Sequence, residues 1–326
     1  MPWVSWSIWD SGSDFSPGAA GTIPLVSRTQ FADPETSFRR RIQVPPRSPL
    51  VLSIPHAGTA TTGFEGSLAP SLDVCGDADL FVDRLYEVGA GRGRELDGDG
   101  GEVGKHASGS DVSYVAALLS RFVCDMNRHP DDVSRAAVPE HPAPRNADGR
   151  GFVWAVTTTG APTLARPLTV AEWRARQAVH AAYHGAITQA LARARAHFGF
   201  AVLLDGHSMP SIGRSGHNDP GRARADIVPG DRDGTSCAPE LSRLVETHFL
   251  SSGYSVEFNN PYKGGFITTD HGRPADGIHA IQVEIRRDLY MDEATFTPRA
   301  EGFAALQAAL RRLLAEVAQW KPNPRP

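Results

Sequence analysis

Short apolar runs alternate along the chain with longer segments in which apolar residues recur at helical spacing. The apolar runs predict strands over residues 49–54, 112–119, 122–125, 200–205, 254–258 and 278–285. The helical spacing predicts helices over residues 79–88, 169–199, 238–250 and 297–320. Between them, residues 209–236 are rich in Gly, Arg and Asp and are expected to form a loop. This alternation predicts the α/β fold class.

One boundary pair in this pattern is especially clear. Thr169 and Glu172 have the spacing of a capping box, which begins a helix, and Gly199 is a typical stop. The N-terminal 38 residues differ from the rest, because Trp3, Trp6 and Trp9 are followed by a stretch rich in Gly, Ser and Pro. We interpret residues 1–38 as an arm, either docked on the body or binding a partner. Residues 39–326 are expected to be a single α/β catalytic domain.

Composition removes several classes of function. Lys and Arg number 33 and Asp and Glu number 37, a net charge of −4, which argues against a nucleic-acid partner. No apolar run approaches 18 residues and no secretory signal pattern opens the chain, so no membrane contact is expected. Cys75, Cys124 and Cys237 form no CxxC pair and are expected to be reduced thiols in a cytoplasmic protein. The oligomeric state is not indicated.

Polar side chains able to carry chemistry stand at the ends of four predicted strands. They are His56, then Asp125, Asn127 and Arg128, then Asp205 and His207, and finally Glu284. Each alone has an ordinary structural explanation as a turn cap, a hydrogen-bonded core residue or a surface ion pair. Their joint placement favours a site, because ligands of open α/β sheets bind at the carboxyl ends of the strands.

Two histidines from separate strands suit a zinc ion. A catalytic zinc takes about three protein ligands and leaves one position for water. The third ligand would be a carboxylate from the start of the next segment, at Asp77, Asp79 or Asp83. Glu284 would then carry the proton of the attacking water. Asn127 and Arg128 supply an amide and a fixed cation for a substrate carboxylate or an oxyanion.

At these residues the sequence resembles the N-formylglutamate amidohydrolase family. The matching strings are LSIPHAGT (52–59), DAD (77–79), SRFVCDMNR (120–128), DGHSM (205–209), PYKGG (261–265) and EIRRDLYMDE (284–293). They follow the family's order. The resemblance implies a fold similar to zinc carboxypeptidases and aspartoacylase, with a mixed, mostly parallel sheet between helices.

The resemblance also implies a reaction, the hydrolysis of N-formyl-L-glutamate to formate and L-glutamate in histidine breakdown. It implies one Zn²⁺ per chain held by His56, Asp79 and His207, with Asp77 as the second choice for the carboxylate ligand. Glu284 matches the general base. The Asn127–Arg128 pair matches the groups that bind the carboxylate of a small anionic N-acyl amino acid.

One departure concerns the substrate. The family usually has Thr-Arg-His-Tyr-Gly after the Lys-Gly-Gly motif, whereas Thr269 replaces the arginine here. If that arginine contacts the glutamate side chain, this chain prefers another acyl amino acid or compensates elsewhere. Lys263, Arg273 and Arg286 are the candidates for compensation.

Three alternatives stay open. The first is a zinc carboxypeptidase, or a deacylase for a different N-acyl amino acid, which a comparison of formate and acetate release separates. The second is a non-catalytic binding protein on the same scaffold, which the presence of both histidines and Glu284 disfavours. The third is a metal-dependent phosphoesterase, since Asp, His and Asn also serve two-metal sites.

Overall fold

The computed structural model describes residues 33–88 and 112–323. Most of the predicted arm, residues 1–32, therefore lies outside the described residues. Within residues 33–38 the chain forms the short 3₁₀ helix η1 (Pro34–Thr36) and enters its first strand. Among the described helices, none combines the length and the apolar character that a membrane crossing requires.

A six-stranded sheet forms the centre of the described protein. Its strands are β1 (Phe38–Arg41), β2 (Leu50–Ile54), β3 (Ser113–Ala117), β4 (Ala201–Met209), β5 (Ile227–Gly230) and β6 (Ile278–Arg286). The order is β1-β3-β2-β4-β6-β5, with parallel pairs in the middle and antiparallel strands at both edges. The expectation of a mixed, mostly parallel sheet is confirmed. A separate hairpin pairs β7 (Met291–Asp292) with β8 (Thr297–Pro298).

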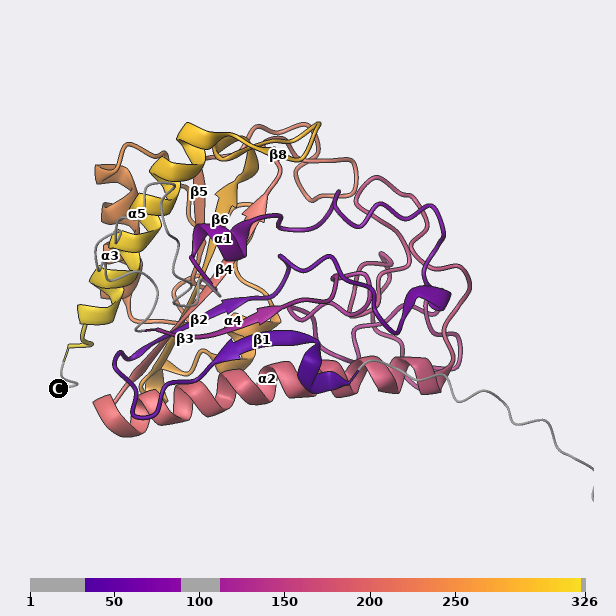
Figure 1. Cartoon of the computed structure of the whole chain (residues 1–326), viewed down its shortest axis with the longest axis horizontal. Helices are drawn as coiled ribbons and strands as arrows, with labels where there is room; N and C mark the ends of the chain where they lie inside the picture. Colours follow the sequence, from indigo (N-terminus) through magenta and orange to yellow (C-terminus); the bar gives the residue numbers. More distant parts are fainter. Residues whose placement is uncertain (1–32, 89–111, 324–326) are drawn as a thin grey trace, which may run out of the picture. The chain divides into compact units, whose positions relative to one another are not determined.

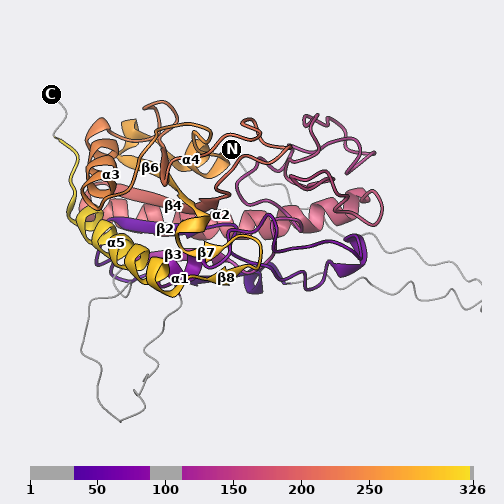
Figure 2. The same cartoon turned by 90° about the horizontal axis from the view of Figure 1, so that it is seen from above.

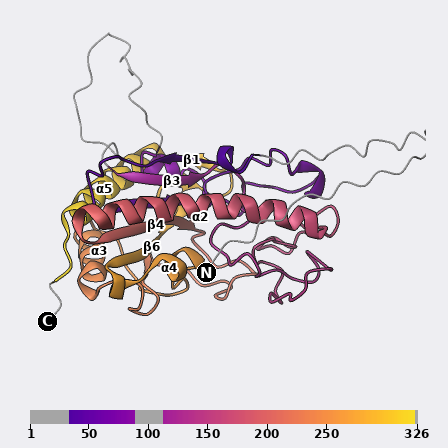
Figure 3. The ribbon, with the colours of Figure 1, turned by 90° about the horizontal axis from the view of Figure 1, so that it is seen from below.

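Helices cover both faces of this sheet. One face carries α2 (Val170–Phe198) and α4 (Phe266–His271), which are seen from below in Figure 3. The other carries α1 (Val82–Leu85), α3 (Pro239–Ser251) and α5 (Ala300–Gln319), with α3 and α5 side by side in Figures 1 and 2. Short 3₁₀ turns at Glu65–Ser67, Pro274–Asp276 and Arg287–Leu289 complete the elements. The sheet thus separates two apolar cores.

The helix α2 confirms the sequence signals for its ends. Thr169 accepts a hydrogen bond from the backbone of Glu172, the Glu172 side chain accepts one from the backbone of Thr169, and Gly199 ends the helix with φ of 83°. Only glycine adopts such a φ without strain. Twenty-nine residues long, α2 runs across β2, β3 and β4 and fixes one side of the sheet. The predicted helix 238–250 is confirmed as α3. The predicted helix 297–320 is confirmed as α5 from Ala300 onward, whereas Thr297 and Pro298 form the strand β8.

Four predictions of local structure are wrong. Residues 122–125 form a turn rather than a strand. Residues 254–258 form coil and a turn, in which Val256 makes one isolated bridge to Ile227 that does not extend into a strand. The predicted loop 209–236 contains the edge strand β5. The predicted helix 79–88 shrinks to the single turn α1, since Phe81 takes a positive φ of 66°.

The pairing of β4 with β6 sets the geometry of the functional end of the sheet. Their parallel register places His207 opposite Glu284 and Asp205 opposite Gln282. Gly206 lies between the two site residues of β4, where a Cβ would be 2.6 Å from the ring of Tyr86 and 2.7 Å from Ile54. This position therefore needs glycine. Long connecting segments, including residues 118–169, extend beyond the sheet at the right of Figure 1.

Candidate active site

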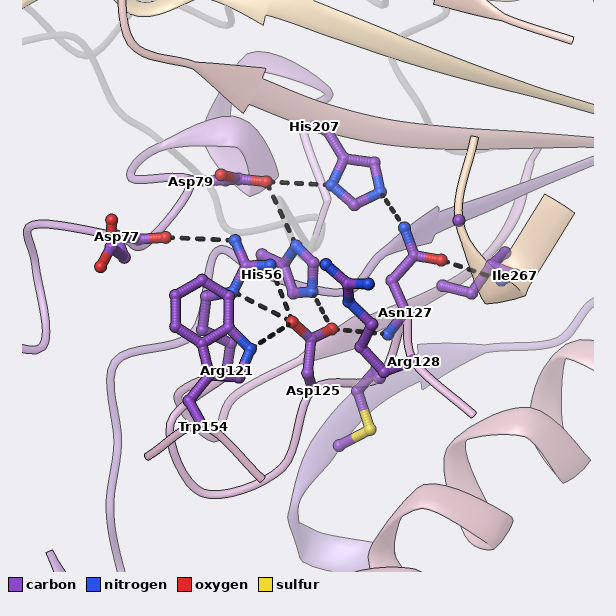
Figure 4. Close-up of polar contacts among 12 residues, drawn as sticks. His56, Asp77, Asp79, Arg121, Asp125, Asn127, Arg128, Trp154, His207 and Ile267 are labelled. Carbon is purple, nitrogen blue, oxygen red and sulfur yellow. Dashed lines mark hydrogen bonds and ion pairs between the residues drawn. The ribbon is translucent and has the colours of Figure 1, made fainter. Parts of the chain in front are cut away.

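Three side chains predicted as metal ligands meet beyond β2 and β4. His56 follows β2, His207 lies near the end of β4, and Asp79 precedes α1. Oδ2 of Asp79 is 3.1 Å from Nδ1 of His207 and 3.6 Å from Nδ1 of His56 (Figure 4). All three side chains are at most 3% exposed. The structure therefore brings together the triad that the sequence nominated.

Each histidine is oriented from behind by a buried carboxylate. Nε2 of His56 lies 2.7 Å from Asp125 Oδ1, and Nε2 of His207 lies 2.9 Å from Asp205 Oδ2. A carboxylate fixes the proton of a neutral histidine on the nitrogen that faces it, so Nδ1 of each neutral ring keeps a lone pair toward Asp79. Carboxylate–histidine pairs of this kind are the usual second layer around protein-bound metals.

A network of donors in turn fixes Asp125. Arg121 donates from Nη2 to Asp125 Oδ2 at 2.7 Å, and the indole of Trp154 donates to the same oxygen at 3.1 Å. The backbone of Asn127 donates to Oδ1 at 2.9 Å. Burial alone would raise the pKa of Asp125, but Arg121 and His56 hold it well below its usual value. Asp125 is therefore a permanent anion behind His56.

Asp79 and Asp77 have different environments. Oδ1 of Asp79 accepts from Arg287 at 3.0 Å, which leaves Oδ2 directed at the two histidines. Burial opposes ionisation of Asp79, yet the adjacent His207 and His56 rings hold its pKa well below the usual range. Asp77 instead binds the backbone and hydroxyl of Thr158 and the guanidinium of Arg214. The structure thus places Asp79 in the triad and Asp77 outside it.

Glu284 stands on β6 beside the triad. Its side chain is buried, and Gln282 donates a hydrogen bond to its Oε1 at 2.9 Å. Burial raises the pKa of Glu284 to about 7, even though His207 acts in the opposite direction. A carboxyl group with such a pKa exchanges protons readily near neutral pH. The observed face of β6 also agrees with the sequence, since Ile281, Val283 and Ile285 enter the opposite core.

Asn127 and Arg128 follow Asp125 and line the same cavity. Oδ1 of Asn127 accepts from the backbone of Ile267 in α4 at 2.8 Å, and its side-chain nitrogen donates to Gln282. Asn127 is therefore rigid. The Arg128 side chain is 45% exposed, and its one ion pair within residues 33–88 and 112–323 is a 3.9 Å contact with Asp132.

A cavity of about 520 Å³ opens over these residues. Lys263 and Thr269 line it, although Lys263 is mostly exposed and paired with Asp233 at 2.8 Å. Arg286 does not line this cavity, because its guanidinium is held by Asp226 at 2.9 Å and Asp288 at 2.6 Å. Arg287, the next residue, lines it instead.

A second group of potential ligands lies between α2 and α4. It consists of His184, His271 and the exposed Asp270. Nδ1 of His184 lies 2.9 Å from Nε2 of His271, while Nε2 of His184 lies 2.9 Å from the carbonyl oxygen of Met126. One tautomer of each ring satisfies these contacts, so this group is accounted for by hydrogen bonding that anchors the segment before Asn127.

Some functional residues had no clear sequence signal. Asp125 and Asp205 appeared only as polar residues at predicted strand ends, and nothing in the sequence connects either to its histidine. Arg121 and Arg287 are charged residues within the matching strings, and only the fold shows that each holds a carboxylate of the site. Sequence spacing is no general signal for this second layer, because Asp205 lies 2 residues from His207 whereas Asp125 lies 69 residues from His56.

Fold and site together define an α/β protein with a buried His–Asp–His centre, a neighbouring glutamate and an open polar cavity at the carboxyl edge of its sheet. The model of the family described as N-formylglutamate amidohydrolase matches residues 48–291. The chain belongs to this family of amide-hydrolysing enzymes.

Individual relatives agree with the family match. The chain is 33% identical over 294 residues to N-formylglutamate deformylase of Pseudomonas aeruginosa, covering 88% of this chain and 97% of the relative. It is 32% identical to the N-formylglutamate deformylase of Pseudomonas putida, covering 84% and 94%. The crystal structure of N-formylglutamate amidohydrolase from Ralstonia eutropha JMP134 superimposes with a TM-score of 0.73 at 33% identity, covering 87% and 97%.

Proposed function

We propose that this protein hydrolyses the amide bond of N-formyl-L-glutamate, releasing formate and L-glutamate, with one zinc ion per chain. The observation that carries the proposal is the buried triad of His56, Asp79 and His207 beside Glu284. The relatives named N-formylglutamate deformylase support the substrate. Cys75, Cys124 and Cys237 are free, which supports a cytoplasmic, reducing compartment. A role in histidine breakdown is part of the same proposal.

The triad fits a zinc ion. Ligands about 2.0–2.1 Å from zinc at tetrahedral angles lie about 3.3 Å apart. The separations of 3.1 and 3.6 Å from Asp79 Oδ2 to the two histidine nitrogens bracket that value. Nδ1 of His56 is buried and has no hydrogen-bond partner among the described residues. An acceptor facing a carboxylate in this way is stabilised by a cation between them.

The charge of the surroundings supports the same assignment. Asp79, Asp125 and Asp205 lie around two histidines that are neutral when they act as ligands. Burial alone would lower the pKa of His207, but Asp205 and Asp79 hold it well above its usual value. The centre therefore favours positive charge. When bound, zinc would supply a Lewis acid that activates water and polarises the formyl oxygen.

The chain's own residues then account for binding and proton transfer. Glu284 accepts a proton from the water that attacks the formyl carbon and returns it to the nitrogen of the leaving amine. Asn127 and Arg128 hold the α-carboxylate, so that the formyl group points at the triad. Arg287 and Asp125 keep the ligands in place through ion pairs and hydrogen bonds. We assign Lys263 a weaker role at the cavity rim because Asp233 already pairs with it.

A substrate panel tests the proposal. Zinc-loaded protein is offered N-formyl and N-acetyl derivatives of glutamate, together with a peptide that has a C-terminal glutamate, and formate, acetate and free amino acid are measured. We expect formate and glutamate in equal amounts from N-formylglutamate and far slower release from the others. Preferred release of acetate would favour a different deacylase, and preferred release of a C-terminal residue would favour a carboxypeptidase.

A further inference from the structure

The arginines that line the cavity differ in how many of their guanidinium nitrogens have hydrogen-bond acceptors. Arg121 donates to Asp125 and to the carbonyl of Asp77, and Arg287 donates to Asp79, Ser208 and the carbonyl of Gly76. All three nitrogens of each of these guanidinium groups donate within the site. Arg232 also lines the cavity, but it is exposed and donates to the carbonyl of Gly264. Arg128 and Arg150 line it as well, and each has only one long contact to a carboxylate among the described residues.

Arg150 is the more enclosed of the two weakly paired arginines. Its side chain is 18% exposed, and its one side-chain contact is a long 3.4 Å hydrogen bond from Nη2 to Asp148. Asp148 is itself 57% exposed. In the described part of the chain, Nε and Nη1 of Arg150 have no hydrogen-bond acceptor. A Cβ at Gly216 would lie 2.3 Å from Nη1, so the backbone of the 210–226 segment confines the guanidinium.

A guanidinium that is largely removed from water needs acceptors for its five donors. Open donors that face a cavity are therefore best explained by an anionic ligand. The planar fork of arginine matches a carboxylate, which accepts two parallel hydrogen bonds. Arg128, whose ion pair with Asp132 is 3.9 Å long, provides a second guanidinium group in the same cavity.

The two arginines lie in the connecting segment between β3 and α2, each close in sequence to a residue that contacts the site. Arg128 follows Asn127, whose side-chain nitrogen lies 3.2 Å from Nε2 of His207. Arg150 precedes Trp154, whose indole donates to Asp125 behind His56. Arg150 and Arg128 both act electrostatically on Asp148, which lines the same cavity, so the two cations face one region of it. N-Formylglutamate carries two carboxylates, one next to the amide nitrogen and one at the end of its side chain.

We propose that Arg150 is a specificity-determining residue that binds the side-chain carboxylate of the acyl amino acid, while Arg128 binds the α-carboxylate. This assignment rests on the proposed function. It supplies a cation for the glutamate side chain in a chain that has Thr269 where the family usually has arginine. Thr269 lines the cavity but donates its hydroxyl to the carbonyl of Gly265. Acidic N-formyl amino acids are then preferred over neutral ones.

The test compares two substrates of nearly equal shape, N-formylglutamate and N-formylglutamine, in zinc-loaded wild type and R150Q. The matched control is R145Q, which removes the same charge from an exposed residue outside the cavity. In R150Q we expect kcat/KM for N-formylglutamate to fall about 10- to 100-fold, while kcat/KM for N-formylglutamine changes less than about 2-fold. R145Q should match wild type on both substrates.

An equal fall of kcat/KM on both substrates in R150Q, or no fall on either, overturns the assignment. If circular dichroism shows that R150Q is unfolded, R150K replaces it. R150K should keep part of the preference for N-formylglutamate over N-formylglutamine, because lysine keeps the positive charge but cannot form two parallel hydrogen bonds. Absence of formate from both substrates in wild type overturns the proposed function instead. Calorimetric binding of N-formylglutamate to wild type and R150Q then decides the assignment, and equal affinities reject it.

Discussion

We predict that the carboxylate of Asp125 stabilises the fold around the site and, through His56, strengthens metal binding. Asp125 is fully buried and accepts from His56, from Arg121 twice, from Trp154 and from the backbone of Asn127. D125N keeps the shape but removes the charge and replaces one acceptor oxygen by a donor. Arg121, only 16% exposed, then loses its counter-ion.

The size of the effect follows from that burial. Breaking a buried ion pair by removing one partner costs about 3–5 kcal/mol. The lower end applies, because Arg121 keeps a hydrogen bond to the carbonyl of Asp77. At about 2–4 °C per kcal/mol for a domain of this size, a loss of about 3 kcal/mol lowers Tm by about 6–12 °C. Losing the carboxylate that orients a metal-binding histidine weakens metal affinity by about 10- to 100-fold.

Both quantities are measured on one preparation. Thermal unfolding of metal-free protein gives the change in Tm, and competition with a zinc chelator of known affinity gives the change in Kd. D233N serves as control, because Asp233 forms an exposed ion pair with Lys263 that contributes about 0–1 kcal/mol. A D125N protein with the Tm and zinc affinity of wild type would refute the role given to Asp125.

Three further changes have defined outcomes. E284Q should retain zinc and lose about 10²- to 10⁴-fold in kcat, and turnover within a factor of ten of wild type would exclude Glu284 as the base. H207A should bind less than a tenth of the zinc of wild type by elemental analysis, and full zinc content would remove His207 from the triad. G206A should lower the unfolding free energy by about 1–3 kcal/mol, because the added Cβ meets Tyr86 and Ile54. An unchanged denaturation midpoint would contradict that packing.

Local signals predicted the long elements well. Helix α2 has a capping residue, a clear period and a terminal glycine, and each signal acts within a few residues. The edge strand β5 was missed because its four residues, Ile227–Gly230, include a proline and a glycine. Its place at the sheet edge, where β6 is its one strand neighbour in the described sheet and Val256 adds an isolated bridge to Ile227, explains why proline is tolerated. Position within a sheet is a tertiary property that a short sequence window does not contain.

The apolar run at residues 122–125 shows the opposite error. Phe122, Val123 and Cys124 are buried as strand residues would be, but the backbone turns there, with Val123 bonded to Ser120 and Asp125 bonded to Phe152. Burial and strand structure give the same apolar signature over so few residues. The error had little effect on the site, because a turn delivers Asp125 to the same edge of the sheet.

The sequence indicated which residues meet at the site better than it indicated what supports them. His56, Asp79 and His207 were nominated from strand ends, zinc chemistry and family resemblance, and they do converge. The partners Asp125 and Asp205 belong to a second layer that depends on side-chain direction in the turn at residues 122–125 and along β4. Arg150 was not nominated, since its open donors become visible only when the surrounding residues are in place.

A zinc titration of formate release tests the central claim most directly. Metal-free protein receives increasing zinc, and the initial rate of formate release from N-formylglutamate is followed at each addition. The account predicts a rate near zero without metal and a linear rise that ends at one zinc per chain, with a flat response in H207A. Full formate release by the metal-free protein, or none at any zinc concentration, would contradict it.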